Sequence, residues 1–366
     1  MRIAFVLPGF GVGGAERVAS LLCNSWTKRG HTVTAITFEA PGDEPSYTLH
    51  EAIDLRQIDT VHGRKTFVSR VVNNGRRILR LRSALRAARP DIVVAFMTEA
   101  NVLALCAAAS LRIPVVISER NQPERPGLDA LHRLARRLTY PLASAVVVQT
   151  KAIADWIKRA FHAPVLVIPN PVSLETTVEP TIRGSDKRIV AVGRLVRQKG
   201  FDILIASFAQ LVPHYPNWTL HIYGEGTERS VLEAQIESLS LSDRIQLHGV
   251  TNDLLSVYAG ASIFVLPSRY EGHPNVLLEA LSMGCPVIAT DCPGATSDIL
   301  HGGRYGLLIP PDDVEALRLA LDRMISDEPL RATYSGRARE AVTPLEVGTI
   351  ADRWLDLFSA IANPSR

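Results

Sequence analysis

Residues 270–281 read YEGHPNVLLEAL and follow directly on the apolar run SIFVLP at 262–267. This pattern predicts a strand, a loop and a helix whose entry is marked by Pro274 and Asn275. Glu271 lies in the loop, and Glu279 follows eight residues later, about one turn into the helix. Because the first amides of a helix favour an anion, the segment predicts a phosphate site with a carboxylate on either side.

Two glutamates alone would fit exposed surface charges. Here Leu277, Leu278 and Leu281 surround Glu279 with apolar residues, and a buried carboxylate needs hydrogen-bond partners. Carboxylates accept hydrogen bonds from hydroxyl groups, often two at once. A nucleoside diphosphate sugar carries a diphosphate between two hydroxyl-rich sugars, so the segment predicts a ligand of that kind.

Length and composition set the class of protein. The 366 residues predict two domains, and 46% hydrophobic with 21% charged residues exclude a disordered chain. A net charge of +3 gives no argument for nucleic acid, and four scattered cysteines predict thiols in a reducing compartment. The N-terminus shows no secretory signal, and the longest apolar stretch, 102–111, is too short to span a bilayer. We therefore expect a cytoplasmic protein.

Short β-branched runs alternate with helical patterns along the whole chain, which predicts parallel sheets covered on both faces. We expect strands at 3–7, 32–38, 92–96, 115–118, 145–149 and 165–168, and again at 188–192, 219–223, 245–248, 263–266 and 287–290. The turn-rich PNPV at 169–172 separates the two series. The fold class is thus α/β with two Rossmann-like domains, 1–172 and 173–345. We expect the helix within 346–366, which carries Trp354 and Phe358, to cross back to the first domain.

The loop after the first expected strand is rich in glycine. Gly9, Gly11 and Gly14 match the GxGxxG pattern, and Glu39 ends the next strand, which permits an NAD-dependent oxidoreductase as an alternative. The match is weak, because a glycine-rich loop produces it easily. A more general prediction is that this loop lets the backbone approach a ligand at the start of the first helix.

A second loop, GRLVRQKG at 193–200, follows the first strand of the second domain. Arg194 and Lys199 can converge on a diphosphate, Arg194 as a fork and Lys199 as a point charge. The turns YGEG at 223–226 and HGV at 248–250 add to the same end of the sheet, where open α/β sheets bind ligands. No Asp-x-Asp motif is present, so we expect neither a metal nor a cofactor.

These motifs together with GCPVIATD at 284–291 resemble the retaining glycosyltransferases of family four, which have the GT-B fold of two domains facing a cleft. The resemblance covers nearly the whole chain and is most specific in the carboxyl half. The segments ISERN at 117–121 and PNP at 169–171 bring it closer to bacterial transferases that extend lipid-linked polysaccharide or glycan units.

The resemblance implies roles for individual residues. Arg194 and Lys199 would bind the donor diphosphate, Glu279 the ribose hydroxyls, and Glu271 would lie near the transferred sugar. With Arg194 and Lys199, Glu271 would form the catalytic set. The other implied donor contacts are Gly13, Gly14, Gly224, Val250, His273, Pro274, Asn275 and Val276, although a loop histidine such as His273 is equally often a packed ring.

Many family members carry a histidine near the reacting sugar, in the segment that corresponds to 118–121. This chain has Glu119, Arg120 and Asn121 there instead. The departure leaves the sugar-proximal contact open, and we expect Glu119 or Arg120 to provide it or to contact the acceptor.

Residues 62–90 contain nine basic residues and no acidic one. An exposed helix face is the ordinary interpretation, but a basic amphipathic helix also suits an anionic membrane surface. Phe67 is the one aromatic residue in the segment, so a stacking platform for nucleic acid is absent. The sequence therefore predicts membrane contact through Arg76, Arg77 and Arg80, and no nucleic acid partner.

The sequence as a whole predicts a glycosyltransferase that is peripheral on the inner face of the cytoplasmic membrane, and the resemblance implies that it retains the anomeric configuration. It would move a hexose-type sugar from a UDP-sugar to a growing glycan linked to a polyprenyl diphosphate. A GDP-mannose-dependent mannosyltransferase of the same fold is an alternative. The alternatives from other classes are the NAD-dependent oxidoreductase and a non-catalytic binder of sugar nucleotides.

Overall fold

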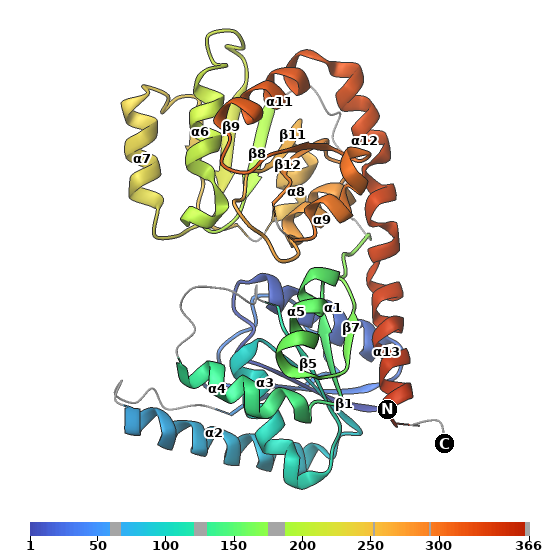
Figure 1. The fold of residues 1–366 in the computed structure, drawn as a ribbon. Coiled ribbons are helices and arrows are strands. Elements are labelled where there is room, and N and C mark those ends of the chain that lie inside the picture. The colour runs from blue at the N-terminus through green and yellow to red at the C-terminus, as the bar shows by residue number, and fades with distance from the viewer. Residues whose placement is uncertain (59–66, 121–129, 175–186, 252, 293, 363–366) are drawn as a thin grey trace. The chain divides into compact units, whose positions relative to one another are not determined.

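The computed structural model describes residues 1–58, 67–120, 130–174, 187–251, 253–292 and 294–362 (Figure 1). The chain divides into two compact units. Unit 1 comprises residues 1–171 and 347–366, and unit 2 comprises residues 172–346. The division at 171 lies one residue before the boundary expected from the turn-rich segment.

Unit 1 contains a seven-stranded parallel sheet in the order β3-β2-β1-β4-β5-β6-β7. Its strands are β1 (Arg2–Leu7), β2 (Thr32–Thr37), β3 (Asp54–Gln57), β4 (Ile92–Phe96), β5 (Val115–Ser118), β6 (Ala145–Val148) and β7 (Val165–Val167). The inner strands are apolar throughout because helices cover both faces of the sheet. Strand β3 reads DLRQ and was missed by the sequence analysis, since a polar edge strand lacks the apolar pattern.

Two helices that are distant in sequence cover one face of this sheet. They are α1 (Gly14–Lys28) and α13 (Val347–Ala362). Trp26 of α1 packs edge-on against Trp354 and Phe358 of α13, with ring centroids 6.3 and 5.4 Å apart. The C-terminal helix therefore belongs to the core of unit 1.

The other face of the unit 1 sheet carries four helices. They are α2 (Phe67–Ala88), α3 (Thr98–Ala108), α4 (Ala130–Thr139) and α5 (Lys151–Phe161), with the 3-10 turns η1 (Ala109–Leu111) and η2 (Tyr140–Leu142). Leu81, Leu105, Tyr140 and Ile157 from these elements pack into one buried cluster with Val6 of β1. Helix α3 contacts α2 as well as α4.

Unit 2 contains a six-stranded parallel sheet in the order β10-β9-β8-β11-β12-β13. Its strands are β8 (Arg188–Val192), β9 (Thr219–Tyr223), β10 (Ile245–Leu247), β11 (Ile263–Leu266), β12 (Val287–Thr290) and β13 (Leu307–Ile309). The first five lie within one residue, at each end, of the strands that the sequence predicts, whereas the short edge strand β13 was not predicted. The fold class is confirmed: each unit is a parallel α/β sheet.

Helices cover the unit 2 sheet on both faces. They are α6 (Phe201–Ala209), α7 (Arg229–Ser238), α8 (Leu254–Ala259), α9 (Asn275–Ser282), α10 (Thr296–Ile299), α11 (Val314–Ser326) and α12 (Glu328–Val342), with the 3-10 turns η3 (Arg197–Lys199), η4 (His301–Gly303) and η5 (Thr343–Leu345). One buried cluster joins α6, α7 and α11, and the other joins α8, α9 and α12.

Each sheet reverses its strand order once. In unit 1 the reversal lies between β1 and β4, and in unit 2 it lies between β8 and β11. Ligands of open α/β sheets bind outside the carboxyl ends of the strands at such a reversal. The topology therefore directs attention to the loops that follow these four strands.

Candidate functional site

The loops after β8 and β11 bring two of the expected site residues into contact. The Lys199 Nζ lies 2.5 Å from the Glu271 Oε1, and both side chains are largely buried. The hydroxyl of the fully buried Ser268 donates to the same Oε1 at 2.6 Å. Charge-assisted hydrogen bonds of this length are strong, so the pair is held in one geometry.

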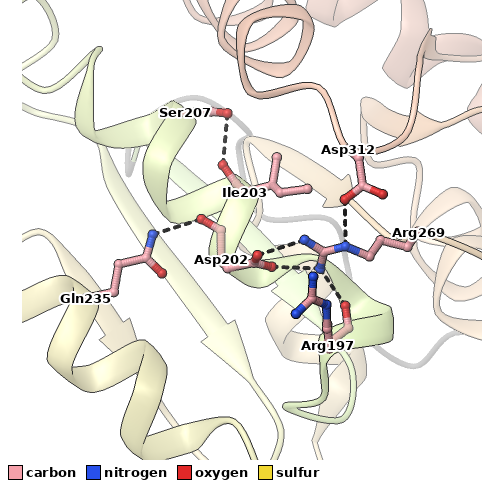
Figure 2. A network of polar contacts seen from close by, with 7 residues as sticks. All are labelled: Arg197, Asp202, Ile203, Ser207, Gln235, Arg269 and Asp312. Atoms are coloured by element: carbon pink, nitrogen blue, oxygen red, sulfur yellow. Dashed lines mark hydrogen bonds and ion pairs between the residues drawn. The ribbon is translucent and has the colours of Figure 1, made fainter.

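Arg269 ties the same two loops together beside that pair (Figure 2). Its guanidinium donates to both carboxylate oxygens of Asp202 on α6, at 2.9 and 2.8 Å. It also donates to Asp312 at 2.6 Å and to the Arg197 carbonyl at 2.5 Å. Burial opposes ionisation of Asp202, but the Arg269 hydrogen bonds outweigh it and hold the pKa of Asp202 below its ordinary value.

Glycine is required where the loops approach one another. Gly200 has φ +67°, and a Cβ there would lie 2.1 Å from the Pro267 carbonyl oxygen at the end of β11. Gly224 has φ +143°, and a Cβ there would lie 1.9 Å from the Gly193 carbonyl oxygen. Only glycine fits both positions. Gly224 therefore packs the loop after β9 against the loop after β8, which is its structural reason for being a glycine.

Glu279 lies on α9 and is buried as its apolar neighbours predicted. The hydroxyl of Tyr258, a buried residue of α8, donates to its Oε2 at 2.9 Å. Helix α9 begins after Pro274, which supplies no side-chain cap, and the first amides of a helix favour an anion. His273 and Val276 are half-buried beside this helix start.

Two further unit 2 candidates are exposed. Arg194 lies on the surface of the loop after β8 and forms no ion pair with another described residue. Val250, in the loop after β10, is also exposed. The structure thus brings Lys199 and Glu271 together directly, and places Arg194 five residues before Lys199 on the same loop.

The glycine-rich loop of unit 1 satisfies its own polar groups. The Phe10 amide donates to both oxygens of Glu39, at 3.0 and 3.1 Å. The Gly13 amide donates to the Tyr47 hydroxyl at 3.2 Å, and that hydroxyl donates to the Gly13 carbonyl at 3.1 Å. Glu39, which follows β2, therefore holds the glycine-rich loop after β1 instead of presenting a carboxylate for the ribose of a dinucleotide.

Glu16 folds back over the start of its own helix α1. A Cβ on Gly13 would lie 2.2 Å from the Glu16 Oε2. Burial raises the pKa of Glu16, while the amides of Glu16 and Ala15 and the nearby Arg120 partly offset that effect. The sequence does not predict this position of Glu16, because nothing in a glutamate of a first turn indicates that it will cover its own helix start.

The segment after β5 divides between the interior and the surface of unit 1. Glu119 is buried and accepts hydrogen bonds from Tyr140 at 2.7 Å and from Thr98 at 3.1 Å. The buried Arg136 lies 3.6 Å from the same carboxylate. These partners all come from the core of unit 1, so Glu119 has an interior position, and Arg120 is the other residue expected near the sugar.

Arg120 is only half-buried. Its guanidinium lies 4.2 Å from the centroid of the Phe96 ring at the end of β4 and donates to Asn170. Burial lowers the pKa of Arg120, and the neighbouring Glu16 opposes that shift. Asn121 lies outside the described residues.

The three arginines expected to contact a membrane differ in exposure. Arg77 forms an ion pair with Glu99 and lies 5.0 Å from the Phe38 ring centroid, so it faces the body of unit 1. Arg76 and Arg80 are exposed. The described helices include none that is long and apolar enough to span a bilayer. Within the described residues, no group of three or more His, Cys, Asp or Glu side chains is placed to hold a metal ion.

Comparison with known families identifies the class of protein that this fold and site define. The profile of the glycosyl transferases group 1 matches residues 175–341. The profile of glycosyltransferase family 4 matches residues 12–176. The two matches together extend through both units. The chain belongs to the glycosyltransferases of the family-four type, and it is a transferase.

Individual relatives agree. An α-1,4-N-acetyl-D-galactosaminyltransferase of Campylobacter jejuni that acts on an undecaprenyl-diphosphate-linked glycan is 26% identical and covers 99% of both chains. An exopolysaccharide phosphotransferase of Streptomyces coelicolor is 32% identical over 77% of this chain, which spans only 30% of that longer protein. These and further relatives place the chain among transferases of bacterial polysaccharide and lipid-linked glycan synthesis.

Solved structures share the fold. Sucrose-phosphate synthase from Thermosynechococcus elongatus superposes with a TM-score of 0.85 at 20% identity, and each chain is covered completely. HepE of Anabaena, solved in complex with UDP, superposes with a TM-score of 0.76 at 20% identity, with 98% of this chain and 100% of that chain covered. The fold is GT-B, and the oxidoreductase alternative is set aside because the family and the relatives are transferases.

Proposed function

We propose that this glycosyltransferase uses a UDP-sugar and transfers a hexose-type sugar, with retention of the anomeric configuration, to a polyprenyl-diphosphate-linked glycan. The UDP bound to HepE and the undecaprenyl-linked acceptor of the Campylobacter relative support the two substrate classes. GDP-mannose is the alternative donor.

The observation that carries the proposal is the buried pair of Lys199 and Glu271 at the strand-order reversal of unit 2. It lies between a loop that also presents Arg194 and a helix that starts without a side-chain cap. A diphosphate needs cations and amides, and a sugar needs acceptors for its hydroxyls. This arrangement supplies both within one short stretch of structure.

In the proposed reaction Arg194 and Lys199 stabilise the negative charge that grows on the leaving diphosphate. Glu271 contacts the transferred sugar and Glu279 the ribose hydroxyls. The backbone of residues 273–276 contacts phosphate and sugar, and Gly224 and Val250 border the nucleotide. An oxygen of the leaving phosphate accepts the proton of the attacking acceptor hydroxyl on the same face of the sugar. The protein then contributes positioning and charge stabilisation rather than a strong base.

Unit 1 contributes the acceptor side in this proposal. Gly13 and Gly14 approach the donor, and Arg120 takes the sugar-proximal role. Glu119 acts as a positioning residue, because its carboxylate joins Thr98, Tyr140 and Arg136 directly before Arg120. Anionic lipids attract the exposed Arg76 and Arg80 of α2, which would keep the enzyme at the inner membrane surface.

Calorimetric titration with UDP, GDP, ADP and NADH tests the donor proposal. We expect UDP to bind most tightly, and Glu279→Gln to weaken its binding. The anomeric configuration of the sugar in the transfer product, observed by NMR with each UDP-hexose as donor, tests retention. Preferential binding of GDP favours the mannosyltransferase alternative, and binding of UDP without transfer to any lipid-linked acceptor favours the non-catalytic binder. An inverted product overturns retention.

A further inference from the structure

Helix α4 and the following turn η2 expose three leucines at a regular spacing. Leu134, Leu138 and Leu142 follow one another at intervals of four residues, which places the two helical ones on one face. Their exposed fractions are 53%, 65% and 65%. Single exposed leucines are common in soluble proteins, whereas a row of them marks an interaction surface.

The opposite side of α4 is fixed to the interior of unit 1. Arg136 is buried, contacts Glu119 and lies over the rings of Tyr140, Trp156 and Phe161, with centroids 5.2 to 5.3 Å away. Thr139 is also buried. Because this cation is held by an anion and three rings, the helix cannot rotate to bury its leucines without losing the contact between Arg136 and Glu119. The leucine row therefore faces outward as part of the fold.

The positive charge around the three leucines indicates which kind of partner this surface fits. Arg133 and Arg137 are exposed on the same helix, and residues 130–154 contain no acidic residue. Helix α2, which with α4 contacts α3, is likewise free of acidic residues and exposes Leu79, Val72, Arg76 and Arg80. A two-fold contact between copies of this face would bring like charges together. An anionic bilayer complements both the arginines and the leucines.

We propose that α4 is a membrane-docking helix that inserts Leu134, Leu138 and Leu142 into the boundary between headgroups and acyl chains. Arg133 and Arg137 lie at the level of the lipid phosphates. The leucines of α4 add, to the electrostatic attraction expected of Arg76 and Arg80 on α2, an apolar component that salt does not screen. The Arg136–Glu119 contact joins the docking helix to the end of β5, next to Arg120.

Co-sedimentation with vesicles of phosphatidylglycerol and phosphatidylcholine tests the proposal over a series of salt concentrations. The main variant replaces Leu134, Leu138 and Leu142 with Gln. The matched control replaces Val231, Leu239 and Leu319 with Gln, since these residues of unit 2 are similarly exposed. We expect the α4 variant to lose about tenfold in partitioning at every salt concentration, because each inserted methylene contributes independently of charge. The control should bind as the parent does.

A second variant, Arg133→Gln with Arg137→Gln, separates charge from insertion. It should weaken binding at low salt and match the parent at high salt. The proposal is overturned if the leucine variant partitions like the parent, or if gel filtration shows a parent dimer that the leucine variant converts to monomer while vesicle binding is unchanged. Circular dichroism and UDP titration establish that each variant is folded. Failure of the parent to bind UDP would count against the donor proposal alone, since vesicle binding is read independently.

Discussion

The two loops at the strand-order reversals differ in what they do with their polar groups. In unit 1 the loop after β1 is held by its own surroundings, with Glu39 on the Phe10 amide and Tyr47 on both backbone groups of Gly13. In unit 2 Arg269 joins the loops after β8 and β11 through its hydrogen bonds to Asp202. Lys199 and Glu271 form an ion pair at the strand ends.

The difference shows why topology alone does not assign chemistry. Both units have a glycine-rich loop at the position where open α/β sheets bind ligands. In unit 1 the acidic residue that a dinucleotide would need already has a backbone partner. In unit 2 Arg269 and Asp202 join the loops, and the buried ion pair of Lys199 and Glu271 lies at the strand ends. The predictions below test whether the two loops differ in function as they differ in structure.

The largest expected effect is on turnover when the unit 2 charges are removed. Lys199→Ala and Arg194→Ala should each lower kcat/KM by an amount equivalent to about 2–4 kcal/mol, because each removes stabilisation of the leaving diphosphate. Glu271→Gln should lower kcat more than it weakens binding of free UDP. Steady-state transfer assays measure both quantities, and near-parental activity of the Arg194→Ala, Lys199→Ala double variant would refute the assignment.

A smaller effect, on UDP binding, is expected when the hydrogen-bond partner of Glu279 is removed. Tyr258→Phe removes the hydroxyl that donates to the Glu279 carboxylate at 2.9 Å and should weaken UDP binding by about 1 kcal/mol. The change should appear in KM for the donor with kcat little altered, since the hydroxyl acts through a binding residue. A loss of kcat at unchanged KM would contradict this positioning role, and thermal unfolding of the variant reports any general loss of stability.

In unit 1 the corresponding change should affect stability rather than binding. Glu39→Ala removes the acceptor of the Phe10 amide and should lower the free energy of unfolding by about 1 kcal/mol. UDP affinity should stay within a factor of about two, because Glu39 contacts the Phe10 amide and is not among the proposed donor contacts. Urea unfolding and calorimetry measure the two outcomes. A large loss of UDP affinity without loss of stability would place the donor at the unit 1 loop instead.

The smallest expected effect is a pH dependence of stability at Asp202. Its pKa is lower in the folded protein than the ordinary value of 3.8, so its contribution is fully present above that value and is lost as the pH falls below it. The contribution is at most about 1 kcal/mol, since Asp202 is about half-exposed and solvent screens the pair. The difference in the free energy of unfolding between the parent and Asp202→Asn should therefore shrink as the pH falls from about 6 toward about 3. A difference that grows on acidification would contradict the sign.

The sequence predicted the fold well where the elements are buried. Apolar runs of four to six residues located the inner strands within one residue, because buried parallel strands need apolar side chains on both faces. The edge strands β3 and β13 were missed, since an edge is covered less and tolerates the polar sequence DLRQ. The helix within 346–366 was expected to meet the first domain, and Trp354 does pack on Trp26 there.

For the site, the sequence predicted the charged residues of the motifs but not the residues that support them. Lys199 and Glu271 were placed in one site from their motifs, and they form an ion pair across 72 residues of sequence. Their supports, Ser268, Arg269 and Tyr258, gave no local signal because each acts through a partner that the fold brings near. Either Glu119 or Arg120 was expected at the ligand, and Glu119 lies in the core, since its partners Tyr140 and Arg136 come from elements later in the chain. Arg77 faces Glu99 for the same reason.

The most direct test of the central claim is hydrogen–deuterium exchange of the whole chain with and without saturating UDP. The account predicts that UDP protects the backbone of residues 193–200 and 268–279 most strongly, because the diphosphate and ribose bind there. Protection of residues 8–17 should be weaker, since that loop already satisfies its own polar groups. Strong protection confined to residues 8–17, with unit 2 unchanged, would contradict the assignment of the donor to the loops after β8 and β11.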